Sequence, residues 1–575
     1  MVKLTARLLE NRSVLYLALI AIVLGVFASF GTRLFIMATQ QLAELLWPGT
    51  NGLNQFVDIG AIPAWARLSV PVVGGLLVGL LVYWLPDRRY HGISDVMEAV
   101  AARGGRMNAR SGVGAIAAAT ISLSSGASMG REGPAVHFAA SFAAYLSELL
   151  KLSPRQTMTL LGCASAAAVS TAFNAPLAGA LFAMEVVVGQ YSMAVFAPIA
   201  LATTAGYFAT LSWDHLETWL PVEYTFDWSA SMLWQMLLVG LVCGIAAQSF
   251  IALTRRVGQG LAWLALPAWL KPASAGLIVG GLGLLMPEVL GVGEGAIADI
   301  VDQRLAGSAV VFFLLIKLLA TATSVAGGFC GGVFAPSLAL GAAIGASLVF
   351  VLNQFGWAVD SQLFVVIAMA SMAGAVLGAP ISTLVMAIEL TKTYDFLLPA
   401  MIGIGVSSLV MQIGEHRSFF RWQLAGRGVD LAASRDRSVL NEISVEEIIR
   451  EQPLVELPQS VSVQSINRAF FTAKVPILVG QHDRAYWMID LPQWRQVATD
   501  LPPDAMINLE NWTLVSLRPS ATLTRALEVF GDSELAYLPI IDRHGVYRGV
   551  VGREQIWRRA AQGYASARKL EHGVN

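Results

Sequence analysis

Charged side chains are scarce in this chain, and cysteine is nearly absent. Only 13% of the 575 residues are charged, whereas 55% are hydrophobic, more than a soluble domain can bury. The net charge of −1 disfavours a nucleic-acid partner. Cys163, Cys243 and Cys330 lack the spacing of a disulfide framework or a metal cluster, so we expect no metal and no cofactor. No nucleophile–base set is present either, so we do not expect an enzyme.

Instead of charged residues and cysteines, the chain has long hydrophobic segments. Each of four is long enough, or nearly so, to cross a hydrocarbon layer of about 30 Å as a helix. They are Ser13–Thr32, Leu68–Leu85, Met236–Leu253 and Tyr394–Gln412. Basic residues precede the first segment without a small-residue cleavage site, namely Lys3, Arg7 and Arg12. This pattern predicts an integral protein of the inner (plasma) membrane with an uncleaved cytoplasmic N-terminus.

Charge density divides the chain into two parts. Charges are sparse up to about Gly414 and dense from Arg435 onward. We therefore expect a membrane domain at 1–430, a linker at 431–441 and a soluble cytoplasmic domain at 442–575.

The membrane part repeats internally. The segment Phe173-Asn174-Ala175-Pro176-Leu177, followed by Glu185, recurs as Leu377-Gly378-Ala379-Pro380-Ile381, followed by Glu389, with nine residues from proline to glutamate each time. Upstream, Gly130-Arg131-Glu132-Gly133-Pro134 is matched by Gly332-Val333-Phe334-Ala335-Pro336. Homologous halves of this kind usually meet at a midplane site built from broken helices. The two Gly-x-x-x-Pro elements are therefore expected to line a pore rather than to form ordinary loops.

These two elements favour an anion as the transported ion. A helix N-terminus presents unpaired N–H groups and about half a positive charge, while glycine lets the backbone approach an ion and proline starts the helix. A cation pathway would need several buried carboxylates or a ring of carbonyls, and acidic residues are few here. Glu132 lies beside the same donors, so its carboxylate could take the place of a halide and release it when protonated. The alternative is a first-turn glutamate that only complements the helix dipole.

The soluble part also repeats. Pro458-Gln459-Ser460-Val461, with Phe470 and Val475-Pro476-Ile477, is echoed by Pro519-Ser520-Ala521-Thr522-Leu523, with Phe530 and Leu538-Pro539-Ile540. The second copy continues into a turn and another strand at Gly549-Val550-Val551. We expect a small tandem α+β module.

Three motifs together resemble the CLC chloride channels and proton-coupled chloride antiporters. They are Gly130–Pro134, Phe173–Gly179 and Gly331–Pro336, and the soluble module resembles the paired CBS domains of bacterial and other members. The resemblance implies an all-α polytopic membrane domain of inverted repeats with broken helices, and a homodimer with one pore in each subunit. It also implies Glu132 as the gating residue and Gly130, Arg131, Gly133, Val333 and Phe334 as the anion-binding backbone.

The sequence departs from this family at two pore positions. Where most members read Gly-Ser-Gly-Ile-Pro, this chain reads Tyr90-His91-Gly92-Ile93-Ser94, which puts His91 in the place of the serine that faces the central anion. His91, beside Gly92, either donates an N–H to the anion or packs away from the pore. Phe420 stands where the family has a pore-closing tyrosine, so a ring without a hydroxyl is expected there.

Further departures concern protons and nucleotides. The antiporters carry an internal glutamate where this chain has Val186, so the proton-coupling position is lost. Glu185 occurs in channels and antiporters alike, and a structural pairing role is expected for it. Gly552 and Gln555 stand where nucleotide-binding CBS repeats carry Thr or Ser and Asp. This disfavours adenine nucleotide binding and favours a structural or dimer-stabilising role for the module.

The preferred function is therefore passive chloride conduction across the lipid bilayer, gated by Glu132. The main alternative is a proton-coupled chloride antiporter with a different internal proton path. A third hypothesis is a membrane-anchored sensor with a degenerate pore.

Overall fold

The chain forms two compact units in a computed structural model, Met1–Leu431 and Ala432–Asn575. The structure describes residues 2–47, 62–85, 88–211, 230–357, 359–414, 418–429, 431, 443–452, 454–473, 475, 477–482, 485–499, 501–509, 515–533, 535–542 and 545–561. The expected linker at 431–441 lies outside the described residues, apart from Leu431. The side chains of the three basic residues near the N-terminus lie outside them too.

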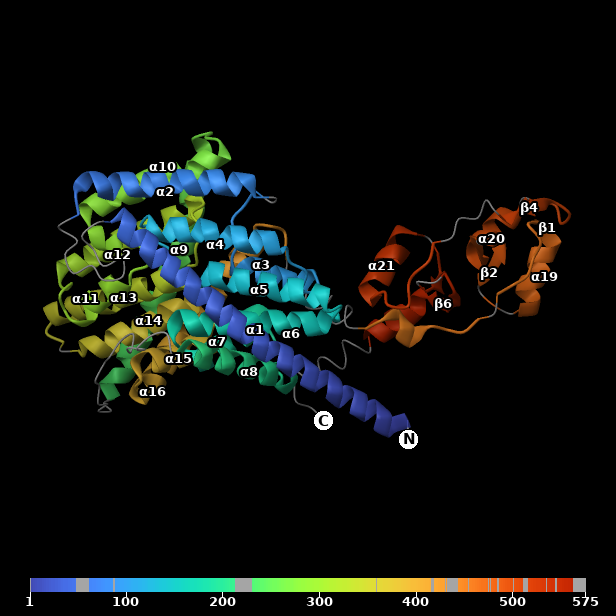
Figure 1. Cartoon of the computed structure of the whole chain (residues 1–575), viewed down its shortest axis with the longest axis horizontal. Helices are drawn as coiled ribbons and strands as arrows, with labels where there is room; N and C mark the ends of the chain where they lie inside the picture. The colour runs from blue at the N-terminus through green and yellow to red at the C-terminus, as the bar shows by residue number, and fades with distance from the viewer. Residues whose placement is uncertain are drawn as a thin grey trace. The chain divides into compact units, whose positions relative to one another are not determined.

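The first unit is helical (Figure 1). Its α-helices are α1 (Val2–Leu46), α2 (Ala64–Trp84), α3 (Ile93–Ala102), α4 (Ala109–Ser124), α5 (Glu132–Leu149), α6 (Pro154–Phe173), α7 (Pro176–Phe182), α8 (Met193–Thr210), α9 (Ala230–Trp263), α10 (Lys271–Leu285), α11 (Glu294–Val301), α12 (Ser308–Gly327), α13 (Phe334–Gln354), α14 (Ser361–Leu377), α15 (Pro380–Thr391), α16 (Leu397–Ile413) and α17 (Phe419–Ala425). The π-helix η2 (Ala183–Val188) continues α7, and the short 3-10 helices are η4 (Ala268–Leu270), η5 (Pro287–Val289) and η6 (Tyr394–Phe396).

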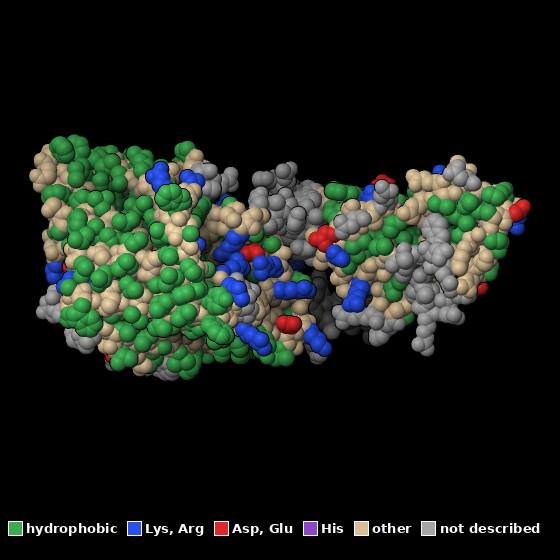
Figure 2. All heavy atoms as spheres, turned by 90° about the horizontal axis from the view of Figure 1, so that it is seen from above, with side chains coloured by type: hydrophobic (Ala, Val, Ile, Leu, Met, Phe, Trp, Pro, Cys, Tyr) green, Lys and Arg blue, Asp and Glu red, His purple; other side chains and the backbone are tan. Residues whose placement is uncertain are grey.

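Eight helices of the described residues are long and apolar enough to cross a membrane. All four predicted segments overlap helices of this set, so the prediction of several spans is confirmed. Figure 2 shows hydrophobic side chains over most of the visible face of this unit, with Lys and Arg gathered at one end. Other apolar helices of the described residues are shorter, with 10–17 residues, namely α14, α15 and the continuous stretch of α7 and η2 at Pro176–Val188. The stretch of α7 and η2 and the helix α15 begin after the matched Ala-Pro breaks, so they are the broken helices that the repeat predicted.

The internal repeat is visible in the packing. Helix α5 packs on α6 as α13 packs on α14, and α1 packs on α8 as α9 packs on α16. Helices α6 and α14 both end in a left-handed residue, Asn174 with φ 55° and Gly378 with φ 69°. Each is followed by Ala-Pro, and the proline begins the next short helix, α7 or α15. The same local sequence therefore breaks the chain at matching places in both halves.

Glycines bring α2 and α10 into close contact, and the two helices lie side by side in Figure 1. A Cβ on Gly276 would lie 2.2 Å from the carbonyl oxygen of Pro71, and a Cβ on Gly75 would lie 2.2 Å from that of Pro272. Gly79 and Gly280 repeat this close approach four residues further along each helix. This small-x-x-x-small spacing is the usual means of close helix packing in a membrane, where hydrophobic association is weak.

The second unit is a small α+β assembly with two hydrophobic cores. Its elements are η7 (Val445–Ile448), β1 (Ser460–Ser462), α19 (Val463–Ala473), β2 (Ile477–His482), β3 (Ala485–Asp490), α20 (Leu491–Ala498), β4 (Met506–Asn508), α21 (Leu523–Asp532), β5 (Tyr537–Ile541) and β6 (Tyr547–Gly552). Strands β2 and β3 pair antiparallel, as do β5 and β6. The β2–β3 hairpin contributes side chains to both cores, and it shares one of them with the β5–β6 hairpin. The predicted α+β class is thus confirmed.

Candidate functional site

The two Gly-x-x-x-Pro elements meet in the interior of the first unit. Gly130 and Gly332 form an antiparallel bridge in which each N–H donates to the carbonyl of the other, at 2.8 and 2.6 Å. A Cβ added to Gly133 would lie 3.1 Å from the Cα of Gly332, so only glycine permits this backbone approach without displacement. The first turns of α5 and α13 consequently lie next to one another.

Glu132 joins these two helices directly. Its Oε1 accepts a hydrogen bond of 2.6 Å from the Phe334 N–H, at the N-terminus of α13. The side chain is buried, and Oε2 has no hydrogen-bond partner among the described residues. The carboxylate therefore occupies a helix N-terminus, the kind of position where an anion is stabilised by backbone N–H groups and the helix dipole. The predicted convergence of Glu132 with Val333 and Phe334 is present.

Phe334 also contacts the first half through its ring. Its centroid lies 4.5 Å from that of Phe173 and 6.4 Å from that of Phe182. Val333 is the N-cap of α13, and its carbonyl accepts from the backbone and hydroxyl of Ser337. The Val333–Phe334 peptide is therefore held by both halves of the unit.

Arg131 and Gly130 have structural partners. The Arg131 guanidinium donates to the Ala172 carbonyl at 3.0 Å and pairs with Glu294 at 2.7 Å. The Gly130 N–H is used in the bridge to Gly332. An anion-binding role for either of these groups would require these bonds to break, so they hold the shape of the site in this state. Glu294 lies in none of the sequence motifs, so its pairing with Arg131 was not predicted from the sequence.

His91 lies in a buried polar cluster before α3. Its Nδ1 is 3.3 Å from Asp95 Oδ1, and Asp95 also pairs with Arg89 and Arg427, each at 3.0 Å. Gly92 is the N-cap of α3, and its N–H donates to Asp95 Oδ2 at 2.9 Å. Gly92 was predicted from the sequence to bind the anion, but its N–H already has an acceptor in this structure.

A second histidine packs on the first. The His137 ring, on the second turn of α5, stacks on His91 with centroids 4.9 Å apart and an interplanar angle of 16°. Both residues are at most 3% exposed. His137 was missed, although a lone ionisable residue in the apolar run after Glu132 is a signal of its own.

Phe420 and Val186 are both buried. Phe420 lies on α17, and its ring is in an edge-on contact with Phe419 at 6.0 Å. Val186 lies in the π-helix η2 at 6% exposure. Neither side chain carries a group that binds a proton.

Glu185 and Glu389 cap helices across the repeat. Glu185 accepts from the N–H groups of Ile381 and Ser382, at 3.1 and 2.8 Å, at the start of α15. Glu389 accepts from Leu177 and Ala178, at 3.0 and 2.8 Å, at the start of α7. Each half therefore supplies the cap for the broken helix of the other, which confirms the structural pairing role predicted for Glu185.

A buried lysine was also missed. Lys317 lies in the middle of α12 at 0% exposure, and its Nζ donates to the carbonyls of Val289 and Gly291 at 3.0 and 2.9 Å. These carbonyls precede Glu294, the partner of Arg131. A single lysine inside an apolar helix could have been noticed from the sequence.

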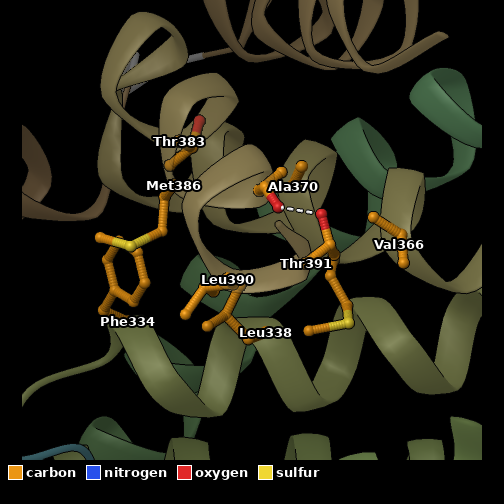
Figure 3. A pocket seen from close by; sticks show the side chains of 10 residues that line it. Phe334, Leu338, Val366, Ala370, Thr383, Met386, Leu390 and Thr391 are labelled. Carbon is orange, nitrogen blue, oxygen red and sulfur yellow. Dashed lines mark hydrogen bonds between the residues drawn. The ribbon is translucent and has the colours of Figure 1, made fainter. Parts of the chain in front are cut away.

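An apolar cavity that Phe334 helps to line lies between α13, α14 and α15 (Figure 3). Its lining residues are Phe334, Leu338, Val366, Met369, Ala370, Thr383, Met386, Ala387, Leu390 and Thr391. The two threonine hydroxyls bond to helix carbonyls, Thr391 to Ala387 and Thr383 to Ala379. The cavity thus offers no convergent polar groups for an ion.

Known proteins of similar sequence and fold include chloride channels and antiporters. The family described as voltage gated chloride channel matches residues 74–412. A putative chloride channel protein ClcB-like from Ralstonia nicotianae is 33% identical over 405 residues, which cover 67% of this chain and 90% of that protein. The voltage-gated ClC-type chloride channel ClcB of Escherichia coli is 30% identical, over 71% of this chain and 98% of that one.

Solved structures share the fold at lower identity. A slow cyanobacterial Cl−/H+ antiporter superimposes with a TM-score of 0.62 at 19% identity, covering 72% of this chain and 98% of that one. A eukaryotic CLC transporter gives 0.61 at 17% identity and covers 94% of this chain and 98% of that one. Together with the paired glycine elements around Glu132, these matches show that the chain is an integral membrane protein of the voltage-gated chloride channel (CLC) family, whose members transport anions.

Proposed function

We propose that this protein conducts chloride passively across the membrane and that Glu132 is its gate. The observation that carries the proposal is the hydrogen bond from the Phe334 N–H to Glu132 Oε1. A carboxylate oxygen held by that N–H stands in for an anion, because both are stabilised by the same unpaired backbone donors. Gate and ion therefore compete for one helix terminus.

Protonation of Glu132 weakens this competition. A neutral carboxyl group loses most of its attraction to the N-terminus of α13 and no longer repels an approaching anion. Val333 and Phe334 then become the anion ligands, while Gly133 keeps the backbones close enough for passage. The rest of the predicted set, Gly130 and Arg131, supports the site through the bonds to Gly332 and Glu294.

The side chains near the pore favour conduction over strict proton coupling. Val186 and Phe420 are buried and carry no titratable group. The Escherichia coli relative is named a chloride channel. The cyanobacterial protein of similar fold, in contrast, is described as a slow Cl−/H+ antiporter. The second candidate is therefore an antiporter that uses a different internal proton path.

The orientation follows from exposed basic residues. Arg103, Arg106 and Arg110 lie near Lys151 and Arg155, since Gly104 and Gly105 approach Pro154 and Thr157. Lys and Arg are enriched on cytoplasmic loops, so this face is the cytoplasmic one, in the inner (plasma) membrane. The N-terminus and the soluble domain at 442–575 are assigned to the same side.

The soluble domain is assigned as a CBS-like pair with a structural role. Gln555 Oε1 accepts from the Gly552 N–H at 2.9 Å, and Arg553 donates to three carbonyls at the end of α21. The Gln555 side chain, which stands where a nucleotide-binding repeat carries Asp, is therefore used within the protein. We further propose that the protein is a homodimer with one pore in each subunit. We propose no enzymatic activity and no nucleotide ligand for it.

The test is a flux assay with purified protein in liposomes, recording chloride and proton movement together. A channel dissipates a chloride gradient without moving protons against a pH gradient. Proton movement uphill at a fixed chloride-to-proton ratio would establish the antiporter. Absence of chloride flux at every pH would leave only a sensor with a degenerate pore.

A further inference from the structure

Exposed basic residues gather where one end of α5 meets the starts of α4 and α6. Helix α5 lies between α4 and α6 in Figure 1 and packs on both. A Cβ on Gly112, in α4, would lie 2.7 Å from the Cβ of Ser141, in α5. A Cβ on Gly105, shortly before α4, would lie 2.6 Å from a methyl carbon of Thr157, in the first turn of α6. The four exposed cations at this place, called the basic surface below, are Arg106, Arg110, Lys151 and Arg155.

The basic surface has few counter-charges. Among the described residues, no acidic side chain pairs with any of its four cations. The first turns of α4 and α6 contain no acidic residue. Of the acidic residues nearby in the chain, Glu98 pairs with Arg103, and Glu148 is exposed in the last turn of α5. Most of the positive charge is therefore available to an anion from outside the protein.

Exposed apolar side chains border the basic surface on the same helices. Tyr145 and Leu149 are four residues apart on α5, and both are more than half exposed. Val113 is also exposed, three residues after Arg110 on α4. Tyrosine is enriched where the hydrocarbon layer of a membrane meets water. The cations therefore lie at the depth of lipid headgroups, with side chains suited to hydrocarbon next to them.

The end of α2 marks the same depth. Helix α2 packs on α4, and a Cβ on Gly114 would lie 2.2 Å from a methyl carbon of Leu85, the residue after α2. Tyr83 and Trp84 are exposed there, and the Arg88 guanidinium lies 4.8 Å from the centre of the Tyr83 ring. Aromatic residues beside cations are typical of the boundary between membrane and water.

We propose that the basic surface binds the headgroup of an anionic phospholipid of the phosphatidylglycerol class, with an acyl chain of the lipid against Tyr145 and Leu149. The phosphodiester oxygens accept charge-assisted hydrogen bonds from Lys and Arg. A zwitterionic lipid brings its own cation to the same place, so it binds more weakly. A soluble phosphate satisfies the cations but leaves the apolar border uncovered.

The test uses the purified full-length protein in a nonionic detergent and follows the midpoint of thermal unfolding during a titration. A ligand that binds only the folded form raises this midpoint, so the concentration giving half of the maximal rise reports relative affinity. The probes are phosphatidylglycerol, phosphatidylcholine with the same acyl chains, the deacylated headgroup glycerophosphoglycerol, and inorganic phosphate. Phosphatidylglycerol should act at a concentration at least about tenfold lower than the other three, and higher potassium chloride should weaken its effect.

Two site variants remove the cations of one chain segment at a time. Lys151→Gln with Arg155→Gln should require at least about tenfold more phosphatidylglycerol for the same rise, and Arg106→Gln with Arg110→Gln should act in the same direction. If one of these variants does not fold, the other decides the question.

The matched control is Arg256→Gln with Lys392→Gln, which removes one exposed arginine and one exposed lysine of the same unit outside the basic surface. Lys392 and Lys151 also share a left-handed backbone, with φ 58° and 52°. This control should respond to phosphatidylglycerol as the wild type does.

Three results would overturn the proposal. The first is a wild-type response to phosphatidylglycerol in both site variants. The second is an equal loss of response in the control variant, since the effect would then follow the total charge of the protein. The third is a rise with glycerophosphoglycerol or inorganic phosphate at the concentration at which phosphatidylglycerol acts, which would identify a site for a soluble phosphate.

Discussion

Replacing Glu132, the proposed gate, with Gln removes the negative charge of the side chain but keeps its shape. The amide oxygen of the substituted side chain can still accept from the Phe334 N–H, which now binds Glu132 Oε1 at 2.6 Å. What disappears is the negative charge beside the path of the anion. We therefore expect chloride flux to rise at neutral pH and to lose its dependence on pH.

The expected rise in chloride flux can be estimated from the repulsion between the Glu132 carboxylate and the anion. Two unit charges about 4 Å apart interact by about 4 kcal/mol at an effective dielectric constant of 20. A factor of ten in occupancy corresponds to about 1.4 kcal/mol, so relief of only a third of this repulsion is enough for a tenfold effect. An increase of at least about tenfold at pH 7 is expected on this basis.

The assay is chloride efflux from liposomes between pH 4.5 and 7.5, with the membrane potential held by a potassium ionophore. Glu148→Gln is the matched control, because Glu148 lies on the same helix α5 but is exposed. It should behave like the wild type. If Glu132→Gln kept the wild-type pH profile, gating would belong to another group and the competition argument would be refuted.

Further predictions concern stability. Glu389→Ala removes the acceptor for two N–H groups at the start of α7, and should lower the free energy of unfolding by about 1 to 3 kcal/mol, read as a lower midpoint of thermal unfolding in detergent. Gly276→Val places side-chain atoms against the Pro71 carbonyl, so it should separate α2 from α10 and reduce the yield of monodisperse protein, whereas Gly281→Val, at a position with open space, should not. Burial raises the pKa of Asp490, in the second unit, to about 6, above the value near 3.9 of an unfolded chain. The folded form then binds the proton more tightly, so stability is greatest below about pH 4 and falls as the pH rises through about 6. Asp490→Asn should therefore slow hydrogen exchange of residues 477–509 at pH 7 but not at pH 4, and equal protection of both proteins at pH 7 would contradict this.

The sequence by itself determined the class of this protein and the meeting of its two Gly-x-x-x-Pro elements. Apolar segments long enough to cross a bilayer indicate a membrane protein. The Gly-x-x-x-Pro motif occurs in both halves at nearly the same distance from the next Ala-Pro. Because homologous halves of this kind usually meet at a midplane site, the convergence of Glu132 with Val333 and Phe334 could be predicted from the sequence, whereas the hydrogen bond itself is seen only in the structure. The role of Glu185 was foreseen only as structural, since the identity of its partner depends on how the halves pack.

The tertiary structure alone decided which donors are free and which ionisable groups meet. No pattern places His137 on His91, because their 46-residue separation is closed only when α3 packs on α5. The N–H of Gly92 is bonded to Asp95, and that of Gly130 to Gly332, as a result of turn geometry that composition does not encode. Arg131 likewise forms an ion pair with Glu294, which is 163 residues away in the sequence. The Lys317 ammonium donates to two backbone carbonyls rather than pairing with a carboxylate. Local sequence encodes helix ends and membrane spans, whereas contacts between distant buried polar groups depend on packing of the whole unit.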